Sequence, residues 1–138
     1  RVKFINSVEQ FCFKSSSRSV VFIAEKNLSE IKVVNDQIGN PTSTSAVTYL
    51  IKDLLRTDYK GVVHGTCEGS ATWYDFAKTI FELSGLHQKV VPCTSKEFVR
   101  PAPRPRNSRL EKRVIRLLRL QSMPEWKEEL ANYLRTSI

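Results

Sequence analysis

Cysteine and histidine are scarce in this sequence, and neither residue type is clustered. The cysteines and histidines of the chain are Cys12, Cys67, Cys93, His64 and His87. No two of them have the sequence spacing of a zinc ligand pair. This pattern argues against a zinc centre and against a disulfide framework, and it leaves the use of another metal open. It predicts reduced thiols in a cytoplasmic protein.

Long apolar runs are also missing. The sequence contains no stretch of about 18 apolar residues free of charge, so we expect no membrane-spanning segment. There is neither a starting methionine nor a secretory leader, and we expect the chain, which starts at Arg1, to come from within a longer sequence. Its 138 residues, 41% hydrophobic and 26% charged, predict a single globular domain over residues 1–138.

Glycine is too sparse for a phosphate-binding turn. The five glycines are isolated from one another, whereas dinucleotide-binding and P-loop motifs need closely spaced glycines. Tyr74 and Lys78 have the spacing of a catalytic Tyr-x-x-x-Lys pair, but Tyr74 lies off the buried face of a predicted helix, so we expect no catalytic role for it. Carboxylates are dispersed, and no general acid–base pair is indicated. We therefore expect no catalytic residue in this chain.

Positive charge, in contrast, is abundant and concentrated in one segment. The net charge of +8 comes almost entirely from residues 100–119, which hold eight basic residues and a single acidic one, Glu111. Such a patch suits a phosphate-bearing ligand, a nucleic acid or an acidic surface. From composition alone, a solvated helix face explains the arginines equally well.

Hydrophobic periodicity predicts short strands alternating with helices. We expect about four strands, at residues 1–5, 31–34, 61–66 and 90–93. Pro92 favours an edge position or an early end for the last of them. Residues 6–19 show no clear period and are expected to be irregular, although we assign a helix across residues 8–26. The fold class is therefore α/β with some α+β character.

We expect about four to five helices in all, because apolar residues recur at helical spacing in several stretches. The best-specified helix runs over residues 72–84, with a capping box of Thr72 and Asp75 at its start and Gly85 as its stop. The others lie at residues 47–55, at residues 110–120 as a basic amphipathic helix, and in the C-terminal stretch behind a second capping box of Ser122 and Glu125.

A polar loop at residues 35–44 joins an apolar strand to an amphipathic helix. Gly39 permits a positive φ, and Pro41 fixes its own φ and pushes Asn40 toward an extended conformation. Any of residues 42–45 suits the helix N-cap. Loops of this kind carry ligand contacts in α/β folds, and an ordinary capped connection is the alternative.

Two groups of side chains suit a nucleotide-linked sugar. Arginines and amide or hydroxyl groups at residues 104–108, namely Arg104, Arg106, Asn107 and Ser108, suit a diphosphate. Neutral donors and acceptors that suit sugar hydroxyls or a base edge lie in the loop, at Gln37, Asn40 and Thr42.

Four motifs in order resemble the C-terminal half of the dTDP-4-dehydrorhamnose reductase family. They are residues 33–42 (VVNDQIGNPT), 69–77 (GSATWYDFA), 104–110 (RPRNSRL) and 126–130 (WKEEL). The resemblance implies the C-terminal part of an extended short-chain dehydrogenase/reductase fold. Such a half binds the sugar nucleotide, while an N-terminal Rossmann half, absent from this chain, binds NADPH and carries the catalytic Tyr and Lys.

The family reduces dTDP-6-deoxy-L-lyxo-4-hexulose, a dTDP-4-keto-6-deoxysugar, to dTDP-L-rhamnose for polysaccharide biosynthesis. By resemblance we expect an oxidoreductase whose isolated C-terminal chain is inactive, with the missing Rossmann half and a second copy as partners. The substrate-binding residues implied are Gln37, Gly39, Asn40, Pro41, Thr42, Arg104, Asn107 and Ser108, with Phe4 at a position where the family has a substrate-contacting Trp.

Two departures from the family keep other functions open. Residues 6–24 lack the family's helix pattern, which fits a non-catalytic remnant or an interaction domain. The stretch after Leu110 is more basic than in the family, which fits a nucleic-acid-binding module, although no stacking aromatics or reading motif accompany it. We expect nucleic acid to be the less favoured partner.

Overall fold

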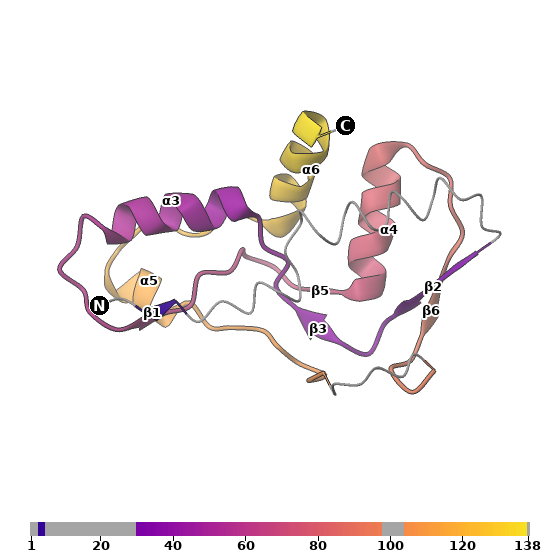
Figure 1. Ribbon diagram of the computed structural model, residues 1–138, viewed down its shortest axis with the longest axis horizontal. Helices are drawn as coiled ribbons and strands as arrows, with labels where there is room; N and C mark the ends of the chain where they lie inside the picture. Colours follow the sequence, from indigo (N-terminus) through magenta and orange to yellow (C-terminus); the bar gives the residue numbers. More distant parts are fainter. Residues whose placement is uncertain (1–2, 5–29, 98–103, 138) are drawn as a thin grey trace.

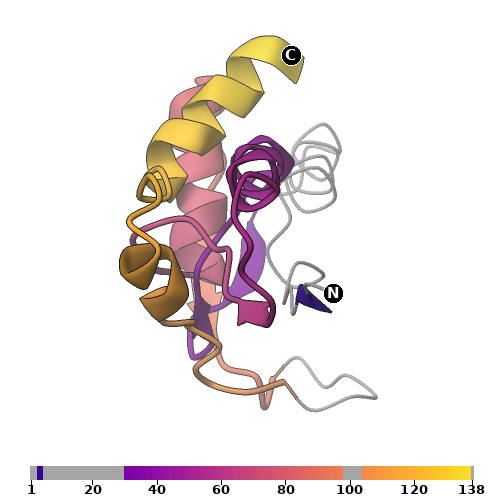
Figure 2. The ribbon, with the colours of Figure 1, turned by 90° about the vertical axis from the view of Figure 1, so that its left-hand side faces the viewer.

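A computed structural model describes residues 3–4, 30–97 and 104–137 of the chain, and the structural statements below concern those residues. Three longer helices, α3 (Thr44–Leu54), α4 (Trp73–Ser84) and α6 (Trp126–Ser137), lie along the upper side of Figure 1, above short strands and connecting loops. The short helix α5 (Arg113–Leu117) lies at the opposite end from α4. The view of Figure 2 shows α4 and α6 side by side. This mixed architecture confirms the predicted α/β fold class.

The described strands form three two-stranded sheets. β2 (Ile31–Val34) and β6 (Val90–Cys93) run parallel, and Pro92 lies exposed opposite Val33, as the edge prediction required. β1 (Lys3–Phe4) pairs in parallel with β4 (Val62–Val63), inside two of the predicted strands. β3 (Ile38–Gly39) pairs antiparallel with β5 (Ala71–Thr72), a pairing that the sequence pattern did not indicate.

Local sequence signals set the ends of α4. The Thr72 hydroxyl accepts a hydrogen bond from the Asp75 amide, and the Asp75 carboxylate accepts one from the Thr72 amide, so the predicted capping box is present. Gly85 ends the helix with a left-handed φ of 67°, a conformation that glycine adopts without strain. The helix prediction for residues 72–84 is confirmed.

The start of α3 is linked to α6. Ser43, one of the four predicted candidates, is the N-cap, and its hydroxyl accepts a hydrogen bond from the Ala46 amide at 3.0 Å. The same hydroxyl donates to the carboxylate of Glu129 on α6. The cap therefore stabilises the helix and also joins two elements that are far apart in the sequence.

Two helix predictions were wrong in their bounds. The basic helix predicted at residues 110–120 covers only Arg113–Leu117, since the Leu110 amide is bonded to the Asn40 side chain and Arg119 has a left-handed φ of 52°. Ser122 does not cap α6, because the backbone before the helix pairs with Glu68: the Glu68 amide donates to the Pro124 carbonyl at 2.9 Å. Tertiary hydrogen bonds override the local pattern at both places.

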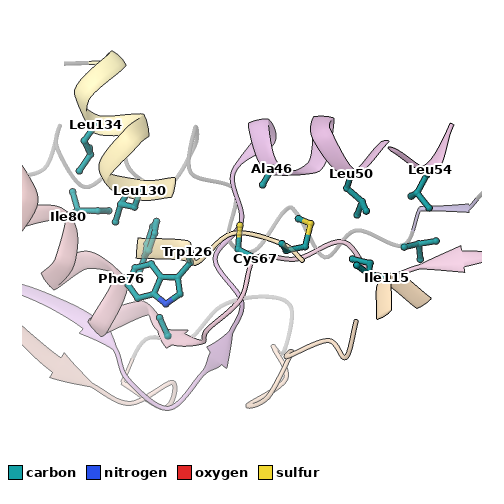
Figure 3. Close-up of a cluster of buried hydrophobic side chains, with 13 residues drawn as sticks. Ala46, Leu50, Leu54, Cys67, Phe76, Ile80, Ile115, Trp126, Leu130 and Leu134 are labelled. Atoms are coloured by element: carbon teal, nitrogen blue, oxygen red, sulfur yellow. The ribbon is translucent and has the colours of Figure 1, made fainter. Parts of the chain in front are cut away.

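One hydrophobic core connects the helices. Phe76 and Ile80 of α4 pack with Trp126 and Leu130 of α6, and the Phe76 and Trp126 rings lie 5.9 Å apart (Figure 3). The core continues through further buried side chains to α3 and α5; these are Met123, Cys67, Ala46, Leu50, Leu54 and Ile115. Packing of α4 against α6 thus forms part of one core that extends to α3 and α5.

The cysteine thiols that the structure describes lie in the protein interior. Cys67 and Cys93 are buried free thiols, and burial raises the pKa of Cys67 to about 11. Within the described ranges, no helix has the length and apolar character needed to cross a membrane. The predicted helix at residues 8–26, the irregular stretch 6–19 and Cys12 lie outside the described residues.

Replacement of Leu130 by Ala tests the α4–α6 packing. Leu130 is 0% exposed, so Leu130→Ala should lower the free energy of unfolding by about 2–5 kcal/mol through lost apolar burial and a cavity. Urea denaturation measures this change. The matched control is Leu117→Ala at a side chain that is 68% exposed, which should cost less than about 0.5 kcal/mol. Equal losses in the two variants would contradict this packing.

Candidate functional site

The polar loop and the arginine segment lie side by side, although about seventy residues separate them in the sequence. The Ile38 amide donates to the Arg106 carbonyl at 2.8 Å, and the Ser108 amide donates to the Ile38 carbonyl at 2.9 Å. The Ser108 hydroxyl donates to the same carbonyl at 3.2 Å. Residues 104–110 therefore run along β3, and the two groups singled out in the sequence meet at one place.

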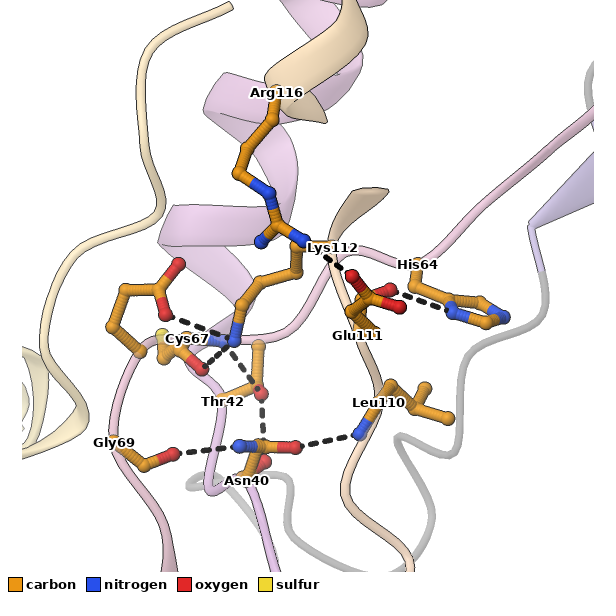
Figure 4. A network of polar contacts seen from close by, with 10 residues as sticks. Asn40, Thr42, His64, Cys67, Gly69, Leu110, Glu111, Lys112 and Arg116 are labelled. Carbon is orange, nitrogen blue, oxygen red and sulfur yellow. Dashed lines mark hydrogen bonds and ion pairs between the residues drawn. The ribbon is translucent and has the colours of Figure 1, made fainter. Parts of the chain in front are cut away.

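Asn40 links three segments through its side-chain amide. Its Nδ2 donates to the Gly69 carbonyl at 2.6 Å, and its Oδ1 accepts from the Leu110 amide at 2.9 Å (Figure 4). Both ends of the amide are thus bonded to backbone on either side of the loop. In this structure the side chain of Asn40 fixes the loop in place. An amide carries both a donor and an acceptor, which suits this structural role as well as it suits ligand binding.

The end of the loop is buried. Thr42 is 4% exposed, and its hydroxyl donates to the Asn40 carbonyl at 2.9 Å while accepting from the Cys67 amide at 3.2 Å. Pro41 and Gly39 are buried as well. These residues shape the loop from within, whereas Asn35 is exposed and Asp36 and Gln37 are half-buried.

Asp36, Gln37 and Ser95 form a hydrogen-bonded chain at the other end of the loop. The Ser95 hydroxyl donates to the Asp36 carboxylate at 2.5 Å and accepts from Gln37 Nε2 at 2.8 Å. The Ser95 amide also donates to Asp36, at 3.1 Å. These hydrogen bonds, the hydroxyl first, lower the pKa of Asp36 below its ordinary value.

Ser95 was missed by sequence reasoning, although a signal for it exists. Asp36 follows β2 and Ser95 follows β6, and these strands are parallel neighbours. Carboxyl ends of parallel strands meet at one edge, where α/β folds gather polar groups. A strand prediction that included the pairing of β2 with β6 would have brought Ser95 to Asp36.

Arg104 lies over an aromatic ring. Its guanidinium carbon is 5.7 Å from the centre of the Trp73 ring, in the first turn of α4, a geometry that favours a cation–π interaction. Trp73 is half-buried. Asn107 is exposed, and its Oδ1 accepts from the amide and Nε of Arg109, each at 3.1 Å. Asn107 lies opposite Ile38 of β3, and Arg104 lies at the start of the segment that runs along this strand.

Lys112 is a second residue that the sequence did not reveal. It is 7% exposed, and its Nζ lies 3.1 Å from the Cys67 carbonyl oxygen and 3.1 Å from Glu68 Oε2. A lysine in a basic stretch is ordinarily solvated, so composition gives no sign of such burial.

The remaining predicted groups lie elsewhere. Phe4 is part of β1, opposite Val63, and its side chain lies outside what the structure describes, so a substrate contact there stays a prediction. His87 is exposed. Tyr74 and Lys78 line an open cavity of about 540 Å³ between α4 and the turn before β6, away from the polar loop. No group of metal-ligating side chains is found in the described ranges.

Comparison with known proteins gives a family and several relatives. A family model described as RmlD substrate binding domain matches residues 14–138. A Bacillus subtilis protein named spore coat polysaccharide biosynthesis protein SpsK is 35% identical over 106 residues, which make up 77% of this chain and 37% of that protein.

Two solved structures of proteins named dTDP-4-dehydrorhamnose reductase are also similar. One, from Clostridium acetobutylicum, has a TM-score of 0.84 and 38% identity over 87% of this chain and 42% of that chain. The other, from Bacillus anthracis and in complex with NADP, has a TM-score of 0.84 and 28% identity over 99% of this chain and 46% of that chain. This chain spans less than half the length of these relatives.

The Asp36–Ser95 contact predicts a pH-dependent effect of Ser95→Ala. Because the folded pKa of Asp36 is below the unfolded value near 3.8, the ionised carboxylate stabilises the fold above that value, and the stabilisation is lost as pH falls through the folded pKa. Ser95→Ala should therefore lower the free energy of unfolding at neutral pH. Its deficit relative to the unchanged chain should shrink as Asp36 becomes protonated.

Urea denaturation near pH 7 and near pH 3 measures the deficit. Ser122→Ala, which removes an exposed hydroxyl, is the control and should change little at either pH. A deficit in Ser95→Ala that stays constant with pH would show that the hydroxyl does not act through the Asp36 carboxylate.

Proposed function

This chain belongs to the RmlD substrate binding domain family, and we propose that it is the sugar-nucleotide-binding half of a dTDP-4-dehydrorhamnose reductase. The whole enzyme is an NADPH-dependent oxidoreductase that reduces dTDP-6-deoxy-L-lyxo-4-hexulose to dTDP-L-rhamnose. The names of the two similar reductase structures and of the polysaccharide biosynthesis relative support this proposal.

The observation that carries the proposal is the meeting of residues 104–110 with the polar loop at β3. Arg104 offers a planar cation held over Trp73, and Arg106 and Asn107 are exposed beside it. Guanidinium groups bind phosphate oxygens through charge-assisted hydrogen bonds, which suits the diphosphate of a nucleotide sugar. Gln37 at the far end of the loop offers neutral hydrogen-bonding groups for the sugar.

The described residues do not fit NADPH. The dinucleotide diphosphate is bound by closely spaced glycines before a helix N-terminus, whereas α3 and α4 begin at the side-chain caps Ser43 and Thr72. We therefore assign NADPH, and the catalytic Tyr and Lys, to an N-terminal half outside this sequence. The chain alone is expected to be inactive as a reductase.

The partners follow from the same proposal. Tyr49 on α3, Leu55 at the C-cap of α3 and Leu117 on α5 are large apolar side chains with exposed fractions of 67%, 79% and 68%. Contact with the cofactor-binding half or with a second copy of the chain would cover such side chains. Cytoplasmic location fits an enzyme that uses NADPH and nucleotide sugars.

Nucleic acid is the less favoured ligand, and a remnant without a ligand is the other alternative. Arg106, Arg109, Arg113, Arg116 and Arg119 are all exposed, which suits a polyanion. However, α5 has five residues, and Arg116 is bonded to Glu111 at 2.5 Å. A short helix with a partly neutralised face offers a weak surface for reading nucleic acid.

Arg104→Ala tests the proposed diphosphate contact. Loss of a charge-assisted hydrogen bond should weaken binding of dTDP by about 1.5–3 kcal/mol, as measured by calorimetric titration. Arg113→Ala is the matched control, because it removes an exposed arginine of the same basic segment from α5. It should leave the affinity for dTDP nearly unchanged.

Equal losses in the two variants would point to general attraction between the basic segment and an anion. In that case the affinity should also fall steeply with salt, as it does for nucleic-acid binding. An unchanged affinity in Arg104→Ala would remove Arg104 from the site.

A further inference from the structure

Lys112 carries a charge into the interior of the protein. The exposed fraction of its side chain is 8%, whereas the arginines on α5, Arg113 and Arg116, are exposed to solvent. Burying an ammonium group is costly unless its hydrogen bonds are made inside the protein. Lys112 makes them with the Cys67 carbonyl and the Glu68 carboxylate. Well-packed apolar side chains in place of the whole Lys112–Glu68 pair are often as stable or more stable, so the buried charge calls for an explanation beyond packing.

The Cys67 residue is held from both sides. Its amide donates to the Thr42 hydroxyl at 3.2 Å, and its carbonyl accepts from Lys112 at 3.1 Å. The Thr42 hydroxyl in turn donates to the Asn40 carbonyl at 2.9 Å (Figure 4). A short series of hydrogen bonds therefore runs from the Lys112 ammonium to the end of the polar loop.

Asn40 closes this series into a ring. Its amide group bonds Gly69, two residues after Cys67, and Leu110, two residues before Lys112. We call the three connected segments, residues 40–42, 67–69 and 110–112, the clasp. Each segment of the clasp is bonded to the other two, so a shift of one segment breaks hydrogen bonds to both neighbours.

We propose that Lys112 is a positioning residue for the sugar-nucleotide site, an inference that depends on the proposed function. Its ammonium holds residues 67–69 against the end of the polar loop and anchors the arginine segment three residues beyond Arg109. Together with the backbone hydrogen bonds of Ile38 to Arg106 and Ser108, the clasp thereby sets the spacing between the loop and residues 104–110. In the proposed function, these two groups bind opposite ends of the ligand. Without the ammonium, the buried Cys67 carbonyl loses its partner, and the chain that follows the arginine segment loses its bond to residues 67–69.

Lys112→Met keeps the length and apolar stem of the side chain and removes its charge. It should raise the dissociation constant for dTDP by about tenfold, because the arginines and the loop no longer hold their spacing. Hydrogen exchange should accelerate at the Cys67 and Leu110 amides, which donate across the clasp, by about tenfold or more. The Ile31 amide, bonded to the Lys89 carbonyl at 2.9 Å outside the polar loop and the clasp, should exchange as before.

Ile115→Val is the control for a loss of stability alone. Ile115 is buried on α5 close to Lys112 in sequence, but it makes no side-chain hydrogen bond to the clasp. This variant should leave the affinity for dTDP within about twofold, and it should not single out the clasp amides for faster exchange. Lys112→Met and Ile115→Val are compared under conditions where both chains are fully folded.

Glu68→Gln gives the same test if Lys112→Met does not fold. It removes the carboxylate partner of Lys112 from a half-buried position and keeps the shape of the side chain. The hydrogen-exchange rates and the affinity for dTDP should change in the same direction as in Lys112→Met, but by a smaller factor. If neither Lys112→Met nor Glu68→Gln changes the affinity for dTDP, the positioning role is refuted, even where the clasp amides exchange faster.

Failure of the proposed function has a different signature. If the unchanged chain does not bind dTDP, the proposed ligand is wrong, and the positioning role at that site is wrong with it. The exchange rates still decide whether Lys112 holds the clasp: normal protection of the Cys67 and Leu110 amides in Lys112→Met would refute that as well.

Discussion

The two hydrogen bonds of the Asn40 amide connect the polar loop to the rest of the molecule. One reaches Gly69 before α4, and the other reaches Leu110 before α5. Together with the backbone bonds of Ile38 to Arg106 and Ser108, they align the arginine segment with the loop. Every part of the proposed ligand site depends on this alignment, because the loop and the arginine segment contribute groups of different chemistry from distant places in the sequence.

The core fixes the frame on which this alignment is built. Phe76 and Leu130 are almost fully buried between α4 and α6, and each such side chain stabilises the fold by about 1.5–3 kcal/mol through burial. The polar contacts contribute less individually, about 0.5–1.5 kcal/mol for a neutral hydrogen bond. Hydrogen bonds are directional, so they fix the orientation of side chains such as Asn40 and Asp36. Apolar packing holds α4 in place but does not set these orientations. The core therefore provides most of the stability, and the clasp sets the geometry of the proposed ligand site.

The sequence predicted those elements whose ends are set locally. Thr72, Asp75 and Gly85 act within a few residues of one another, and the helix between them has the predicted bounds. The loop and the arginines were singled out from their residue types, and the structure places these two groups side by side, while their binding role stays a prediction. The start of α6 and the length of α5 could not be predicted in this way, since they depend on the pairing of Glu68 with the backbone before Trp126 and on the bond from Leu110 to Asn40. Ser95 and Lys112 were missed for the same reason, as their partners lie far away in the sequence.

Titration of the purified chain with dTDP and, separately, with NADPH tests the central claim most directly. A sugar-nucleotide-binding half should bind dTDP with measurable heat and show no heat with NADPH, because the residues for the dinucleotide lie outside this sequence. Raising the salt concentration should weaken the binding of dTDP only moderately, as expected for a few arginine–phosphate contacts. A folded chain that binds neither compound, or that binds NADPH instead of dTDP, would contradict the account.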